Sequence, residues 1–262
     1  MNRIYDALKV HDGHGNIFDQ KALARDVAQL EEVGSSIAVK ECLTGLKRPF
    51  PVITVSSSAR DQIAHLVDRV FLFPVSVAPR ILAFSNIDVG TGSSEVCFNV
   101  GNLLAERASG NVCVIDANGK QSLLGRLVAS NGLRGLSDAM DITDGCKDFL
   151  VQLGDSNLWL LPAGSAGAHP CTFSPDRLHA RLMELRKHFD YILIDAPVAT
   201  APSTLMLGQA ADGVIIVIEA HRTRRENALM AKEVLEAAHI PVIGSVLNNR
   251  TFPIPGAIYR KL

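Results

Sequence analysis

Short apolar segments alternate with amphipathic, helix-like segments from residue 80 onward, and this alternation restricts the fold more than any other feature of the chain. The helix-like segments are 94–107, 175–188 and 224–238. The apolar, strand-like segments are 81–85, 112–116, 158–161, 191–195, 214–219 and 242–247. Because helices of this length connect parallel strands that are apolar on both faces, the pattern predicts an α/β fold with a doubly wound, mostly parallel sheet and helices on both faces.

Residues 1–79 have a weaker pattern than the rest of the chain. Two helix-like segments, 21–32 and 61–72, flank a Pro- and Ser-containing stretch that is typical of a loop or linker. We therefore predict two parts. Residues 1–79 form an N-terminal helical and linker region for partner docking, and residues 80–262 form the α/β domain.

The charge balance of the chain limits its partners. Lys and Arg number 26 and Asp and Glu number 27, so the formal net charge is −1. Neutralising nucleic-acid phosphates requires clustered basic residues. The composition therefore argues against a nucleic-acid partner.

Three features predict a cytoplasmic protein with no transmembrane segment of its own. The five cysteines include no C-x-x-C pair, so they indicate neither a disulfide framework nor a zinc site. Residues 1–25 carry charges throughout and lack the apolar core of a secretory signal. The longest apolar stretch, 70–84, is broken by two prolines and an arginine and is shorter than the ~20 residues that span a bilayer.

The segment after the first predicted strand resembles a phosphate-binding loop. Residues 86–94 read N-I-D-V-G-T-G-S-S and lead into a helix, whose free N-terminal N–H groups favour anions. The Walker A pattern G-x-x-x-x-G-K-[ST] is matched at Gly92 and Ser94, whereas Ile87 stands at the first glycine and Ser93 at the lysine. The loop alone supports a plain strand-to-helix turn and a phosphate loop equally.

Two aspartates favour the phosphate loop. Asp116 and Asp195 each end an aliphatic strand, at the sheet edge where open α/β sheets bind ligands. In P-loop proteins such an aspartate helps to hold Mg²⁺. The alternative for either residue alone is a helix N-cap, but both acids in this order behind the loop favour a metal site.

At this point the chain resembles the cytoplasmic bacterial tyrosine kinases (BY-kinases) and their relatives in capsule and exopolysaccharide synthesis, over about residues 61–250. The loop at 85–95 resembles the family's S-x-x-P-G-E-G-K-S-T, and the segment from residue 115 resembles I-D-A-D-L-R-R-P-S-L. Further matching segments, in order, are 135–138, 160–164, 189–197, 211–214 and 244–248, and the opening 2–9 is also similar. The resemblance implies a sheet of the P-loop NTPase type.

The resemblance also implies roles for particular residues. Asp116 and Asp195 match the catalytic acids, and with Ser94 they would hold Mg²⁺. The residues that would bind ATP are Gly90, Gly92, Ser93, Ser94, Lys120 and Asn248. Lys120 stands where the family has an arginine, and Asn248 stands at a position that resembles the base-contacting asparagine.

The chain departs from the family where phosphate should bind. Ser93 replaces the phosphate-clamping lysine, Glu95 replaces a threonine, and Asp88 adds a second acid to the loop. Glu95 is expected to satisfy the N–H groups at the start of the helix. Elsewhere Asn118 replaces the second acid of D-x-D, and Thr204 replaces an aspartate after the last acidic motif.

These departures predict a catalytically silent family member. Phosphoryl transfer depends on positioning and electrostatic stabilisation, and losing one stabilising group typically costs ~10²–10³ in rate. Such losses are not additive, yet several together should leave little activity. Asp116 and Asp195 are then vestigial, and binding of ATP and Mg²⁺ is more readily lost than kept.

The expected function is a regulatory or scaffold pseudokinase of exopolysaccharide or capsule synthesis and export. The resemblance implies docking on a membrane chain-length co-polymerase, at the inner face of the plasma membrane. The family's E-x-x-R-x-x-R segment falls on Asp61, Ala64 and Val67, and the tail after 252 has only Tyr259, which argues against ring assembly and tyrosine-cluster phosphorylation. Two alternatives stay open: an active ATPase or tyrosine autokinase that recruits its cation from a partner, and a partition-type ATPase.

Overall fold

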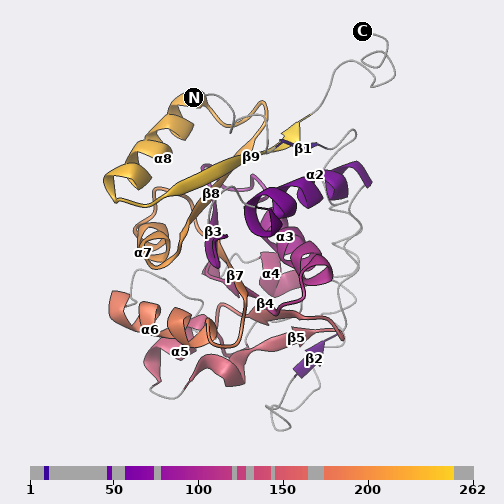
Figure 1. The fold of residues 1–262 in the computed structure, drawn as a ribbon. Coiled ribbons are helices and arrows are strands. Elements are labelled where there is room, and N and C mark those ends of the chain that lie inside the picture. Colours follow the sequence, from indigo (N-terminus) through magenta and orange to yellow (C-terminus); the bar gives the residue numbers. More distant parts are fainter. Residues whose placement is uncertain are drawn as a thin grey trace.

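The computed structural model describes residues 9–11, 46–48, 57–73, 78–119, 123–127, 133–142, 145–164 and 174–250. These residues contain a nine-stranded sheet with the order β1-β9-β8-β3-β7-β4-β6-β5-β2 (Figure 1). Its strands are β1 (Lys9–His11), β2 (Leu46–Arg48), β3 (Ile81–Asn86), β4 (Val112–Asp116), β5 (Val151–Leu153), β6 (Leu158–Leu161), β7 (Tyr191–Ala196), β8 (Gly213–Glu219) and β9 (Val242–Arg250). Neighbouring strands are parallel except β5 and β6, which confirms the predicted fold class.

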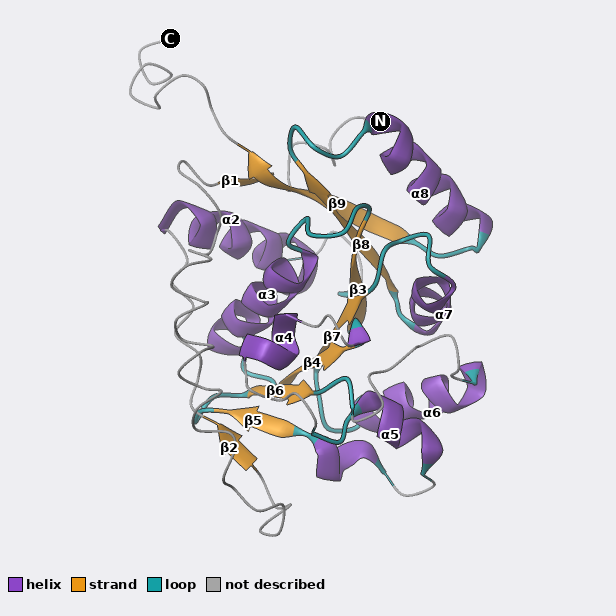
Figure 2. Cartoon of the chain, turned by 180° about the vertical axis from the view of Figure 1, so that it is seen from behind, coloured by secondary structure: helices purple, strands orange, loops and turns teal. Residues whose placement is uncertain are grey.

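Helices cover both faces of the sheet, as the two opposite views show (Figures 1 and 2). One face carries α2 (Ser57–Val67) with its π-helical continuation η2 (Asp68–Leu72), α3 (Ser93–Arg107) and α4 (Leu123–Leu127). The other carries α5 (Leu136–Asp141), the 3-10 turn η4 (Cys146–Phe149), α6 (Pro175–Leu185), α7 (Pro202–Ala210) and α8 (Arg225–Ala237). In the part of the chain that the structure describes, none of these helices is both long and apolar enough to cross a membrane.

Alternate side chains of each central strand enter two different cores. In β3, Leu82 and Phe84 pack with the α2 and α3 side, whereas Ile81 and Ala83 pack with the α6 and α7 side. All four are buried. A strand needs apolar residues at every position to fill two cores, because successive side chains point to opposite faces. This is why the predicted strands are continuous apolar runs and do not alternate with polar residues.

The chain reverses its direction of winding beside β3, and this creates the site. β3 lies between β7 and β8, so α3 leads from β3 to β4 on one face and α7 leads from β7 to β8 on the other. Connections that diverge to opposite faces leave a crevice at the carboxyl ends of the strands, where α/β proteins bind ligands. The loop after β3 and the last residues of β4 and β7 meet at this edge.

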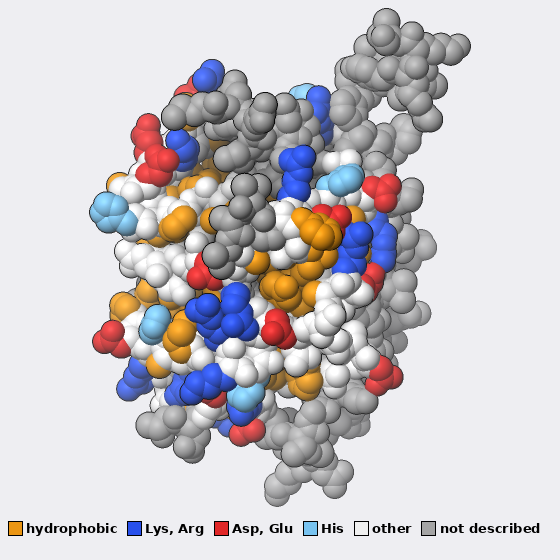
Figure 3. Space-filling view, in the orientation of Figure 1, with side chains coloured by type: hydrophobic (Ala, Val, Ile, Leu, Met, Phe, Trp, Pro, Cys, Tyr) orange, Lys and Arg blue, Asp and Glu red, His pale blue; other side chains and the backbone are white. Residues whose placement is uncertain are grey.

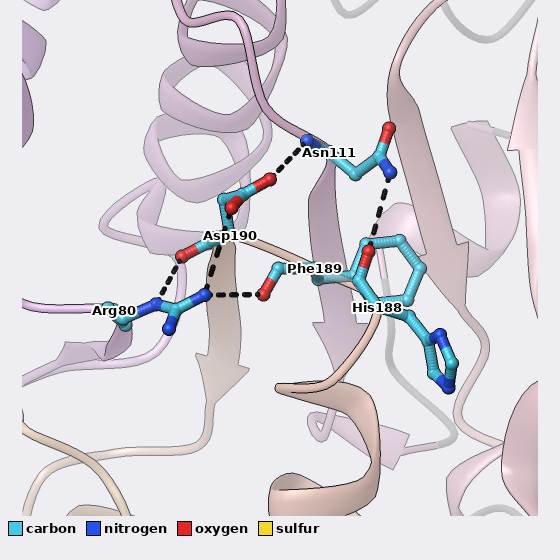
Figure 4. Close-up of polar contacts among 5 residues, drawn as sticks. All are labelled: Arg80, Asn111, His188, Phe189 and Asp190. Atoms are coloured by element: carbon cyan, nitrogen blue, oxygen red, sulfur yellow. Dashed lines mark hydrogen bonds and ion pairs between the residues drawn. The ribbon is translucent and has the colours of Figure 1, made fainter.

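The opposite, amino-terminal edge of the sheet is held by a polar network (Figure 4). Arg80 donates from Nε to the Asp190 carbonyl at 3.1 Å and from Nη2 to the Phe189 carbonyl at 3.3 Å. The Asp190 carboxylate accepts the Asn111 backbone N–H at 3.0 Å. These contacts join the residues that precede β3, β4 and β7, so the three central strands start at a common level.

The packed domain includes residues upstream of residue 80. Ile63, Leu66 and Val67 of α2 and Val70 and Phe71 of η2 are buried in the same core as α3 and β3. The Phe71 ring also packs edge-on against Tyr191 of β7, with ring centroids 5.7 Å apart. The core therefore extends across the predicted boundary at residue 79, whereas the docking role of residues 1–79 stays a prediction.

The sequence pattern did not predict every helix and strand of the structure. The helix expected at 21–32 lies outside the described residues. The helix expected at 61–72 is α2 continued by η2 and begins at Ser57. α7 was missed because Leu205, Met206 and Leu207 follow one another and all contact the core, so it has no helical periodicity.

On the face in Figure 3, acidic and basic side chains of the described residues are interspersed.

The burial of α2 leads to a test by truncation. A chain that begins at residue 57 should unfold cooperatively in urea, whereas one that begins at residue 80 should lose cooperative unfolding. The shorter chain lacks the five side chains of α2 and η2 that lie in this core, each worth ~1.5–3 kcal/mol, in a domain with a stability of about 5–15 kcal/mol. Cooperative unfolding of the residue-80 chain with unchanged stability would contradict the packing described above.

Candidate functional site

The loop after β3 turns on two glycines in left-handed backbone conformations. Gly90 has φ +85° and Gly92 has φ +83°, a region that side chains with a Cβ rarely adopt. A Cβ at Gly92 would also lie 2.5 Å from Asn248 Nδ2. Gly92 therefore has two independent reasons to be glycine, and it immediately precedes α3.

Asn248 of β9 holds this loop in place. Its Nδ2 donates to the Thr91 carbonyl oxygen at 2.9 Å, and the side chain is buried. Among the described residues, Asn248 Oδ1 has no hydrogen-bond partner. The residue predicted to contact a base thus lies at the loop and supports its backbone.

Asp116 and Asp195 lie side by side at the carboxyl edge of the sheet. They are register partners on the neighbouring parallel strands β4 and β7, and both are fully buried. Asp116 Oδ1 accepts the Asn118 backbone N–H at 3.1 Å. The structure therefore brings together the two acids that the sequence placed at strand ends.

The environment of Asp195 disfavours its charged form. Burial raises the pKa of this carboxyl well above its usual range, and the nearby Asp116 carboxylate raises it further. The side chains of Ser94 and Asn118 lower the pKa of Asp195, but by less than burial raises it. Within the described part of the chain, neither Asp195 oxygen has a hydrogen-bond partner of good geometry. Ser94, Asp116 and Asp195, predicted as the metal ligands, are thus neighbours.

The phosphate side of the site is acidic. Ser93, in the lysine position, is buried and its Oγ has no hydrogen-bond partner among the described residues. Burial raises the pKa of Glu95 from 4.5 to about 7. The expected bond from Glu95 to the helix N-terminus is absent from the described contacts, whereas Asp138, at the same position of α5, accepts the Gly135 N–H at 2.9 Å.

A cation that the sequence did not single out lies beside the loop. Arg222 Nη1 is 3.6 Å from the position that a Cβ would take at Gly90. The same nitrogen pairs with Glu219 Oε2 at 2.9 Å, and Glu219 Oε1 accepts from Asn249 Nδ2 at 3.2 Å. The signal in the sequence was a basic run after the β8 strand. Arg222 lies close to the loop because of the turn between β8 and α8, in which His221 has φ +64°.

Other polar residues position the segment after β7. Thr204 Oγ1 donates to the Pro197 carbonyl at 3.1 Å, and Ser85 Oγ donates to the same oxygen. Thr204 therefore has a structural role at the position where the family has an aspartate. Asp88 accepts from Asn227 Nδ2 at 3.3 Å, which joins the loop to α8. Lys120, predicted to contact nucleotide, lies outside the described residues.

The two halves of the site differ in how they fit Mg-ATP. Asp116, Asp195 and the Ser94 hydroxyl are oxygen ligands of the kind that Mg²⁺ takes, so the carboxylate half fits the metal. The loop half carries Asp88 and Glu95 and has Ser93 at the lysine position. It therefore lacks the side-chain cation that a Walker A lysine would bring to the phosphates.

Curated proteins similar to this chain include bacterial tyrosine kinases. The tyrosine-protein kinase CpsD of Streptococcus agalactiae serotype III is 27% identical over 172 residues, which are 64% of this chain and 74% of CpsD. The tyrosine-protein kinase YwqD of Bacillus subtilis is 22% identical over 163 residues, which are 62% of this chain and 68% of YwqD. The chain is a relative of the bacterial tyrosine kinases. No model of a known protein family matches it.

Solved structures share the fold of this BY-kinase relative. The kinase domain of the Escherichia coli tyrosine kinase ETK matches with a TM-score of 0.69 at 18% identity, over 76% of this chain and 78% of that one. The BceF tyrosine kinase domain matches with a TM-score of 0.64 at 20% identity, over 90% and 93%. The MinC:MinD complex of Aquifex aeolicus matches at 0.55 and 20% identity, over 70% and 72%. The fold is therefore common to BY-kinases and other P-loop proteins.

The burial of Glu95 predicts how stability depends on pH. Its pKa of about 7 in the folded chain exceeds the value of 4.5 for a free side chain, so between these values the folded chain binds more protons than the unfolded chain. The free energy of unfolding should therefore fall as pH rises from about 4.5 to about 7. Glu95→Gln should be more stable than wild type at pH 8, by at most ~3 kcal/mol from ~1.4 kcal/mol per pKa unit, and similar at pH 4.5.

Urea unfolding at the two pH values measures this difference. Glu226→Gln is the matched control, because Glu226 is an exposed acid in the first turn of α8. It should change stability little at either pH. Equal stability of Glu95→Gln and wild type at pH 8 would show that the Glu95 carboxylate is not destabilised by burial.

Proposed function

We propose that this protein is a regulatory or scaffold pseudokinase of exopolysaccharide or capsule synthesis and export, and that it does not transfer phosphate. The observation that carries the proposal is the charge of the loop half of the site. The loop carries two acids, Asp88 and Glu95, and Ser93 supplies no positive charge at the lysine position.

The electrostatic argument concerns both binding and catalysis. A triphosphate brings several negative charges to a helix N-terminus, whose dipole contributes only ~0.3–1 kcal/mol per favourable charge. Partly buried Glu95 stands in the first turn of that helix, so phosphate binding requires either its protonation or its displacement. Phosphoryl transfer has no substitute for a positioned cation, because catalysis rests on stabilising the charge of the transferred group.

Several polar residues of the site have roles in holding the fold, in addition to any role inherited from the family. Asn248 supports the loop backbone, and Thr204 and Ser85 position the segment after β7. These contacts keep the shape of a P-loop domain without requiring a nucleotide. A protein with this shape and no turnover is suited to presenting a surface to a partner.

The proposed partner follows from the resemblance to BY-kinases. It is a membrane-embedded chain-length co-polymerase, which would hold this protein at the inner face of the plasma membrane. The opening residues 2–9, which are similar to those of exopolysaccharide-locus kinases, and residues 1–79 as a whole are the proposed docking region. The missing arginines at Ala64 and Val67 speak against a ring oligomer.

A second candidate function is an active ATPase or tyrosine autokinase of the same pathway. One observation favours it: Arg222 lies next to Gly90 and would supply a cation from the same chain. In the folded chain, however, Arg222 is paired with Glu219, so recruiting it to a phosphate requires breaking that pair.

Calorimetric titration with Mg-ATP separates the two functions. We expect no measurable binding by wild type and little gain in Ser93→Lys, whose new ammonium would pair with Glu95. Ser93→Lys combined with Glu95→Thr should bind detectably, because the cation and the helix N–H groups then both face the phosphates. Arg222→Ala is the control for the second function and should leave the wild-type result unchanged. Micromolar binding by wild type that Arg222→Ala abolishes would replace the pseudokinase with the active enzyme.

Polymer export in cells tests the scaffold role. Export should be unchanged by Ser94→Ala, which removes a metal-site hydroxyl, and lost on deleting residues 1–56, which leaves α2 in place. Polysaccharide on the cell surface is the quantity to measure, with protein level checked by immunoblot. Loss of export in Ser94→Ala at normal protein level would indicate that the site works as an enzyme, and normal export without residues 1–56 would exclude them as the docking region.

A further inference from the structure

Exposed apolar side chains of the described residues are concentrated at one corner of the molecule. The large apolar side chains exposed among these residues are Phe73, Val89, Leu229 and Met230. Leu229 and Met230 lie on α8 and are 47% and 53% exposed. Val89 belongs to the loop after β3, which Asp88 joins to α8 by accepting from Asn227 Nδ2 at 3.3 Å. Apolar side chains that gather on a surface mark a contact site for another macromolecule.

α8 has an inner face in the core and an outer face in solvent. Ala231 and Leu235 are buried and pack in the core on the α6 and α7 side of the sheet. The exposed residues of the helix include, on its outer face, Arg225, Glu226, Leu229, Met230, Lys232, Glu233 and Glu236. Figures 1 and 2 show α8 along the margin of the molecule, where no other helix or strand of the described residues lies beyond it. A helix that needs only its inner face for packing would carry polar residues outside, so Leu229 and Met230 require another explanation.

The charges of the outer face are separated along the helix. Arg225 lies in the first turn, whereas Glu233 and Glu236 lie in the last turns. Among the described residues, Arg225 and Glu233 form no ion pair, and Lys232 pairs with Glu236 at 3.2 Å. The helix dipole favours acids at the N-terminus and bases at the C-terminus. The positions of Arg225, Glu233 and Glu236 are the reverse, so the stability of the helix itself does not account for them.

A second copy of α8 is complementary to this order of residues. When two helices pack antiparallel about a two-fold axis at Leu229, the residues four before and four after it face each other across the axis. Arg225 of each copy then lies opposite Glu233 of the other copy. The residues three before and three after, Glu226 and Lys232, form a second pair of opposite charge. Leu229 meets its own counterpart at the centre of the contact.

We propose that the outer face of α8 is a dimerisation surface, and that it binds a second copy of this chain antiparallel about a two-fold axis. A face of one sign would suit a partner of the opposite sign, whereas this face carries both signs in an order that complements itself. An isologous contact closes at two chains and does not continue into a ring. The helix has 13 residues and is therefore about 20 Å long, so the contact is small and the dimer is weak and concentration-dependent.

Sedimentation velocity of the full chain over a range of concentrations, without nucleotide, tests the proposal. Wild type should change from monomer to dimer as the concentration rises, with no larger species. Leu229→Asp places two like charges at the axis and should weaken dimerisation roughly tenfold or more. Phe73→Asp is the matched control, because it changes an exposed apolar side chain outside α8, and it should dimerise like wild type.

Charge reversal tests the antiparallel register. Arg225→Glu and Glu233→Arg each place like charges opposite one another in a dimer of identical chains, so each variant alone should dimerise several-fold more weakly than wild type. An equimolar mixture of the two variants should recover wild-type dimerisation, because each altered residue then faces the opposite charge on the other chain. A variant that had merely lost its fold would not be rescued by mixing.

The outcomes that overturn the proposal are distinct. Wild type that stays monomeric at the highest concentration at which the chain is soluble excludes the dimer. A dimer that Leu229→Asp leaves unchanged lies on another surface, and variants of Arg225 and Glu233 that do not recover on mixing contradict the antiparallel register. The dimer requires neither phosphates nor their absence, so these results leave the proposed function to be decided by the titration with Mg-ATP.

Discussion

The pairing of β4 with β7 is the contact on which the rest of the site depends. It places Asp116 directly opposite Asp195 and buries both carboxyl groups at the carboxyl edge of the sheet. Two acids this close in a dry environment cannot both carry a charge without compensation, and burial and mutual repulsion together raise the pKa of Asp195. Whatever supplies the compensation, a proton or a cation, determines what the site does.

The loop beside these acids is held in shape by contacts within the protein. Gly90 and Gly92 permit the left-handed turns, and Asn248 fastens the loop from the far side of β8. None of these contacts involves the side chains of Ser93 or Glu95, so the residues that set the charge of the loop are different from those that hold its shape. The chain is therefore similar to the BY-kinases in fold, while its loop has a serine at the lysine position and two acids beside it.

Much of the fold was predictable from the order of apolar segments. Strands such as β3 fill two cores and are continuous apolar runs, which leaves an unmistakable pattern. Two features were not anticipated, for identifiable reasons. α7 buries consecutive apolar residues and has no helical period, and the core contribution of α2 depends on its packing against α3, which pattern alone does not reveal.

The sequence by itself determined the fold class, the position of the loop and the presence of a serine at position 93, because these follow from local pattern and from residue identity. Only the tertiary structure decided that Asp116 and Asp195 are adjacent, that Glu95 is partly buried without a described hydrogen bond, and that Arg222 approaches Gly90. Those facts depend on strand order and on the turn between β8 and α8, which join residues far apart in the chain. Whether a side chain can carry a charge follows from the residue type alone. The free energy of that charge depends on surroundings that form only when the chain folds.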